Sequence, residues 1–86
     1  RHVLFRSVDA GQVKKGKPHP ETFLTAADMI GFPPSQCIVF EDSLAGVQAA
    51  IAAGMRVIGI GKPVDLPGAA MHINNLGEFD FDFLNE

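Results

Sequence analysis

The stretch Cys37–Met55, CIVFEDSLAGVQAAIAAGM, contains the pattern that decides the fold. It opens on a continuous apolar run, Cys37–Phe40, which is typical of a strand covered on both faces, as in a parallel sheet. An alanine-rich segment follows at Leu44–Ala53 and predicts a helix that can approach a sheet closely. One stripe of this helix carries the larger apolar residues Leu44, Val47 and Ile51. The stretch therefore predicts a strand followed directly by a helix that ends at Gly54.

The same kind of pattern continues on both sides of this stretch. Val57–Ile60 predicts a second covered strand, with Gly59 where a backbone or ligand comes close. Pro20–Ile30 predicts an earlier helix, since Pro20 suits a first helical position and Gly31 a C-terminal stop. Its buried face is predicted to contain Phe23, Ala26, Ala27 and Ile30.

The two ends of the chain give weaker patterns. Val3–Val8 fits either a strand or a helix end, and His72–Ile73 fits a last short strand. Phe79–Leu84 alternates phenylalanine with aspartate, which fits a strand or a terminal helical turn. Strand, helix and strand with short connections form right-handed βαβ units, so the predicted fold is a doubly wound α/β sheet of three or four parallel strands.

Length and composition limit the functions that the chain can have. The 86 residues form one domain at most, and 47% hydrophobic and 20% charged residues indicate a globular protein. A net charge of −3 does not indicate binding to nucleic acid or to an anionic membrane. No apolar run approaches the roughly 18 residues of a membrane span, and Arg1–Arg6 lacks the apolar core of a signal peptide. From the charge and the lack of a membrane span, we expect no nucleic-acid or membrane partner. A single cysteine, Cys37, forms no internal disulfide, so we expect a cytoplasmic protein.

Two features indicate that the chain is part of something longer. A sheet of three or four parallel strands leaves an unpaired edge, which is costly for an isolated chain. The sequence also begins at Arg1 without an initiator methionine. We therefore expect an N-terminal remainder of the same protein as a structural partner.

Two adjacent carboxylates, Glu41 and Asp42, follow the best-defined strand, and ligands of open α/β sheets bind past the carboxyl ends of the strands. Two unit charges about 4 Å apart repel by about 1 kcal/mol in water and about 4 kcal/mol at an effective dielectric of about 20, so a cation is needed to relieve the pair in a crevice. Mg²⁺ prefers such oxygen ligands and takes one or two of them. The alternative is that Asp42 or Ser43 caps the following helix while Glu41 points to water.

Lys17 precedes Pro18 and lies just before a predicted helix N-terminus, where it can meet a phosphate or offset the two carboxylates. The alternative is a solvated basic loop, because Lys14 and Lys15 are close by. His19 is predicted to be a turn or capping residue rather than a base. No cysteine and histidine cluster has zinc spacing, and no dinucleotide fingerprint or serine nucleophile motif is present.

Three stretches together resemble the haloacid dehalogenase superfamily, most closely its β-phosphoglucomutase-like members: GKPHPETFLTAA (Gly16–Ala27), CIVFEDSLAGVQAAIAAGM (Cys37–Met55) and VIGIG (Val57–Gly61). The resemblance implies a partial Rossmannoid parallel sheet flanked by helices, the C-terminal part of a three-layer core.

The resemblance also implies a chemistry and the residues that perform it. Lys17 corresponds to the catalytic lysine that stabilises the nucleophile and the transferring phosphate, and Glu41 with Asp42 to the acidic pair that holds Mg²⁺. The implied activity is Mg²⁺-dependent phosphoryl transfer through an aspartyl-phosphate. The enzyme would be a phosphatase or a sugar phosphomutase acting on a small phosphorylated metabolite, such as a sugar phosphate.

The sequence also departs from the family pattern. The nucleophilic Asp-x-Asp motif, the phosphate-binding serine or threonine and the helical cap domain are not in it. Asp80 and Asp82 have the right spacing but precede no covered helix, and we do not assign them as substitutes. We therefore expect residues 1–86 to be the C-terminal part of the core domain and to be inactive without the N-terminal part.

Two other functions stay open. One is a truncated, noncatalytic domain that serves in assembly. The other is a phosphoacceptor signalling module, in which the acidic pair precedes the lysine along the chain. Here Lys17 precedes Glu41, which argues against the signalling module.

Overall fold

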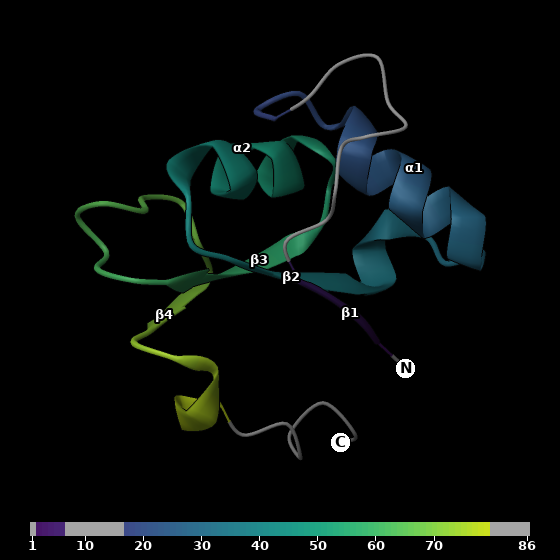
Figure 1. The fold of residues 1–86 in the computed structure, drawn as a ribbon. Coiled ribbons are helices and arrows are strands. Elements are labelled where there is room, and N and C mark those ends of the chain that lie inside the picture. Colours follow the sequence, from purple (N-terminus) through teal and green to yellow (C-terminus); the bar gives the residue numbers. More distant parts are fainter. Residues whose placement is uncertain (1, 7–16, 80–86) are drawn as a thin grey trace.

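The computed structural model describes residues 2–6 and 17–79, which form a four-stranded parallel sheet with helices packed on it (Figure 1). The strands lie in the order β1-β2-β3-β4, so each is hydrogen-bonded to its neighbour along the chain. The elements are β1 (Val3–Arg6), α1 (Glu21–Ile30), η1 (Pro34–Gln36, a 3₁₀ turn), β2 (Cys37–Glu41), α2 (Leu44–Ala52), β3 (Arg56–Ile60), β4 (Met71–Ile73) and η2 (Leu76–Glu78, a second 3₁₀ turn).

The strands and helices predicted from the apolar patterns are confirmed. The largest differences are in β1, which is a strand and ends at Arg6, and in the two 3₁₀ turns, which the sequence analysis did not predict. The alternation over Phe79–Leu84 lies outside the described residues except for Phe79. No helix within the described ranges is long and apolar enough to cross a membrane.

Both α-helices cover the same face of the sheet, and the other face is covered by η2 and Phe79 (Figure 1). Right-handed crossovers repeated in one direction along a sheet place successive helices on one side, which explains the arrangement. The prediction of a parallel α/β sheet with flanking helices is thus confirmed. Among the described residues, both α-helices lie on one face, and the helical element on the other face is the short 3₁₀ turn η2.

Side chains along β2 alternate between the two faces of the sheet, so the strand contributes to the hydrophobic clusters on both faces. Cys37 and Val39 belong to the cluster under the helices, whereas Ile38 and Phe40 belong to the cluster on the other face. Because side chains along a strand alternate between the two faces, Glu41 faces the helices, as Cys37 and Val39 do. The strand is buried along its whole length, Glu41 included.

Helix α2 packs on the sheet through its small residues rather than through its large ones. Gly46, Val47, Ala49 and Ala50 are buried, whereas Leu44 and Ile51 are 40% and 47% exposed. Of the apolar stripe noted in the sequence, only Val47 is in the core. The small side chains allow the helix to approach the strands closely, and this turns the larger ones toward the outside.

Helix α1 ends as predicted, but its buried face is narrower. Gly31 adopts φ 75°, a left-handed conformation that suits glycine, and its N–H donates to carbonyl groups of the last turn. Phe23 and Ala27 are buried, but Ile30 is exposed and Ala26 is half-buried, so these two are corrections to the predicted face. Ile30 is the last residue of α1 and is 44% exposed.

Candidate active site

The site is built around Glu41, the last residue of β2, whose side chain is only 2% exposed. Its Oε2 accepts from the Lys17 Nζ at 2.9 Å, and its Oε1 accepts from the Ser43 hydroxyl at 3.3 Å. A buried carboxylate needs a partner for its charge, and Lys17 supplies it. The expectation that Lys17 and the acidic pair meet at the carboxyl end of the sheet is therefore met for Glu41.

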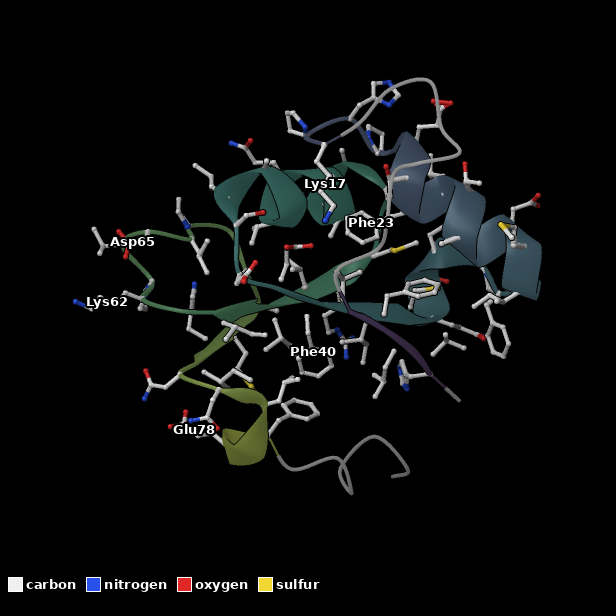
Figure 2. The ribbon with its side chains drawn as sticks, viewed as in Figure 1. Lys17, Phe23, Phe40, Lys62, Asp65 and Glu78 are labelled. Carbon is white, nitrogen blue, oxygen red and sulfur yellow. The ribbon has the colours of Figure 1, made fainter. Side chains whose placement is uncertain are left out.

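Lys17 is held from two sides. It lies in the turn before α1, next to a cis Lys17–Pro18 peptide bond, and its side chain is 21% exposed. Besides the ion pair with Glu41, its Nζ lies 5.3 Å from the centre of the Phe23 ring, within the range of a cation–π contact. Figure 2 shows Lys17 and Phe23 on the helix side of the sheet, whereas Phe40 lies on the other side. The alternative of a freely solvated lysine does not hold for Lys17.

Asp42 differs sharply from its neighbour. It follows the end of β2 and is exposed, and no hydrogen bond or ion pair of its side chain occurs within the described part of the chain. The two carboxylates therefore differ, because Glu41 is buried and paired whereas Asp42 is exposed. Glu41 does not point to water, so that part of the alternative from the sequence is wrong.

The start of α2 is capped by Ser43, whose hydroxyl accepts from the Gly46 N–H at 3.0 Å. Gly46 also makes room for Glu41, because a Cβ added there would fall on the Glu41 Cγ and Cδ. The carboxylate is thus packed against the first turn of α2, where the helix dipole favours negative charge. Capping of this helix by Ser43 belonged to the alternative interpretation of the acidic pair, and this part of the alternative is confirmed.

Two nearby residues have structural roles. The His19 Nδ1 accepts from the Glu21 N–H at 3.1 Å, which confirms His19 as a capping residue at the start of α1. The His72 Nε2 donates to the Leu66 carbonyl at 2.7 Å and holds the loop that follows β3. The close approach predicted at Gly59 comes from these same side chains, because an added Cβ would lie 3.1 Å from His72 and 3.2 Å from Leu66.

The donor set fits part of a magnesium site. Within the described ranges, no group of three or more histidine, cysteine, aspartate or glutamate side chains is gathered to hold a metal. Mg²⁺, however, is usually bound through one or two carboxylates, with waters and phosphate oxygens completing the shell. Asp42 and Glu41 are two adjacent carboxylates of the kind that such a site uses.

Sequence reasoning missed three contributors to this site. Ser43 was considered as a cap but not as a donor to Glu41, and Phe23 was assigned to the core without its contact to Lys17. Gly46 carried a signal, because glycine in the first turn of an alanine-rich helix weakens the helix and needs a packing reason.

The described residues form a parallel sheet with a lysine–carboxylate ion pair at the carboxyl end of its strand β2. This is an α/β arrangement, in which ligands bind at the carboxyl ends of the strands. The family model of haloacid dehalogenase-like hydrolases matches residues 2–54. The chain belongs to this family.

Relatives and solved structures agree with this assignment. The chain is 45% identical over 60 residues to hexitol phosphatase A of Escherichia coli, an alignment that covers 70% of this chain and 28% of the relative. It is 37% identical over 79 residues to β-phosphoglucomutase of Bacillus subtilis, covering 92% of this chain and 35% of the relative.

Among solved structures, β-phosphoglucomutase from Clostridium difficile superimposes with a TM-score of 0.82 and 35% identity, over 91% of this chain and 35% of the other. The chain thus spans about a third of the length of the relatives that it matches.

Proposed function

We propose that this chain is the C-terminal part of the core domain of a phosphatase or sugar phosphomutase, a cytoplasmic enzyme that acts on a small phosphorylated metabolite. The observation that carries the proposal is the ion pair between the Lys17 Nζ and the Glu41 Oε2, 2.9 Å long, beside the exposed carboxylate of Asp42. Family membership and the names of the two relatives, a hexitol phosphatase and a phosphoglucomutase, support the substrate class.

Lys17 has the binding role in this proposal. Its ammonium is partly exposed, so one side faces Glu41 and Phe23 while the rest can meet a phosphate oxygen. Fixing the ammonium before the reaction places a positive charge where negative charge develops on the transferring phosphoryl group. The ion pair keeps the lysine oriented until the phosphate arrives.

Glu41 and Asp42 are the residues that would hold Mg²⁺, and the ion when bound would neutralise charge on the phosphate oxygens. Asp42 is exposed, and within the described ranges each Glu41 oxygen accepts one side-chain hydrogen bond, which leaves a carboxylate oxygen the capacity to accept another. The acceptor of the phosphoryl group, an aspartate in an aspartyl-phosphate mechanism, would come from the N-terminal remainder of the protein. On this proposal residues 1–86 alone do not turn over substrate.

The test uses the full-length protein and an assay for phosphate release from p-nitrophenyl phosphate and from hexose and hexitol phosphates. Transfer between sugar positions is followed by ³¹P NMR. We expect activity that requires Mg²⁺ and is abolished by EDTA. Lys17→Ala and Asp42→Asn should each lower kcat/KM by about 100-fold or more, the scale of losing one charge-stabilising group.

Matched controls are available on the loop after β3. Lys62 and Asp65 are exposed and lie apart from Lys17 (Figure 2), so Lys62→Ala and Asp65→Asn repeat the same chemical changes outside the site. Both controls should retain the parent activity within about twofold, as surface changes usually do. A folded Lys17→Ala protein as active as the parent would contradict the proposal, and a full-length protein without either activity would favour the noncatalytic domain.

A further inference from the structure

The Ser43 hydroxyl makes two hydrogen bonds that serve different groups. It accepts from the Gly46 N–H at 3.0 Å and contacts the Glu41 Oε1 at 3.3 Å. A serine hydroxyl has one proton, and an ionised carboxylate only accepts. The Ser43 proton must therefore point at Glu41, while the lone pair on the other side caps α2.

The Glu41 carboxylate is consequently held at both oxygens. Ser43 holds the Oε1 and Lys17 holds the Oε2, and the missing side chain of Gly46 leaves the space that the Glu41 side chain occupies. Glu41 is almost fully buried, whereas Ser43 is exposed and Lys17 is partly exposed. The position of the Lys17 ammonium thus depends on a carboxylate that is fixed by the start of α2.

We infer that Ser43 is a positioning residue, which orients Glu41 and, through it, Lys17 for phosphate binding. This inference rests on the proposed function. It differs from simple helix capping, because capping needs only the hydrogen bond from Gly46, whereas positioning needs the one to Glu41. The 3.3 Å contact is long for a hydroxyl hydrogen bond, so the effect is smaller than that of Lys17 itself.

The experiment separates the two roles by choice of side chain in the full-length protein. Ser43→Gly removes the hydroxyl at little loss of capping, because glycine is itself tolerated at this position. Ser43→Thr keeps both hydrogen bonds. Ser35→Gly is the matched control, since Ser35 is exposed on η1, at the opposite end of β2 from Glu41.

We expect Ser43→Gly to lower kcat about tenfold, the size of one hydrogen bond to a charged group, with KM close to that of the parent and a urea midpoint lowered only slightly by the loss of the long contact to Glu41. Ser43→Thr should regain most of the parent kcat, and Ser35→Gly should leave it unchanged. A folded Ser43→Gly protein with the parent kcat would overturn the inference. So would a Ser43→Gly defect that appears only as a lower urea midpoint.

A second readout does not depend on activity. The Lys17 ammonium lies over the Phe23 ring, so the ring current should shift the NMR signal of the Lys17 ε-methylene away from that of the exposed Lys62. In Ser43→Gly this shift should shrink by about half or more, and Ser43→Thr should restore it. An unchanged chemical shift in folded Ser43→Gly would contradict positioning, whether or not the protein has phosphatase activity. If the protein has no phosphatase activity but the shift does shrink, the proposed function fails while the positioning of Lys17 by Ser43 stands.

Discussion

Gly46→Ala is the perturbation for which local helix propensity and the structure predict opposite signs. Alanine in place of glycine within a helix stabilises by about 1 kcal/mol on propensity alone. In this fold, however, the new Cβ would fall on the Glu41 Cγ and Cδ. Glu41 must then leave its place and lose its hydrogen bonds to Lys17 and Ser43.

The magnitude follows from these two contacts. A hydrogen bond to a charged group contributes about 1.5–3 kcal/mol, and the partial exposure of Lys17 places its bond to Glu41 toward the lower value. The longer contact from Ser43 adds less. Subtracting the propensity gain leaves a net loss of about 1–2 kcal/mol in the free energy of unfolding of Gly46→Ala.

Urea unfolding followed by circular dichroism measures this change, since the sequence contains no tryptophan or tyrosine to serve as a fluorescence probe. The control is the same substitution in a Glu41→Ala background, where the space above Gly46 is empty. There Gly46→Ala should stabilise by up to about 1 kcal/mol, so the sign reverses within one double-mutant cycle. Stabilisation by Gly46→Ala in the parent would refute the packing of Glu41 against α2.

Three further predictions concern other parts of the molecule. Burial raises the pKa of the Cys37 thiol, so the folded chain should react with a thiol reagent at pH 8 far more slowly than the chain in urea, and equal rates would contradict burial. The Asn74 backbone N–H, and then its side chain, lower the pKa of the Glu78 carboxyl. The stability that Glu78 adds is therefore present above the pKa of the unfolded state and is lost as the pH falls through the lower pKa of the folded state. An NMR titration should show a lowered pKa for the Glu78 carboxyl, and Asn74→Ala should raise this pKa part of the way back. Phe79 meets Phe40 edge to face at 5.0 Å, so Phe79→Leu should lower the free energy of unfolding by about 1 kcal/mol, whereas no loss would show that the ring contact adds nothing.

Much of this fold could be predicted because its elements are separated by strong local signals. Two continuous apolar runs gave β2 and β3, and Gly31 marked the end of α1 through a left-handed conformation that glycine adopts without strain. The 3₁₀ turn at Pro34–Gln36 was not predicted, because it depends on a three-residue geometry with no periodicity to detect.

Burial was less predictable than secondary structure. The sequence placed Leu44 and Ile51 on an apolar stripe, but only contact with the sheet reveals that α2 packs through its alanines and Gly46. In a helix this close to a sheet, small residues face the strands and large ones are displaced outward. Hydrophobic spacing alone does not distinguish the two faces.

Position and residue type made Lys17, Glu41 and Asp42 candidates, and the family resemblance supplied their roles, which stay predictions. The structure brings Lys17 and Glu41 together in an ion pair, a geometry that the sequence did not specify. Glu41 is buried because it faces the helices from the last position of β2, and Asp42 is exposed because it follows the end of the strand. The roles of Ser43 and Phe23 depend on contacts between elements that no single segment encodes.

The most direct test of the account is a crystal structure of the full-length protein with Mg²⁺ and phosphate. We expect the Lys17 Nζ within about 3 Å of a phosphate oxygen and an Asp42 oxygen about 2.1 Å from the metal, with Glu41 beside both. A structure in which the metal and the phosphate bind away from Asp42 and Lys17 would contradict the account.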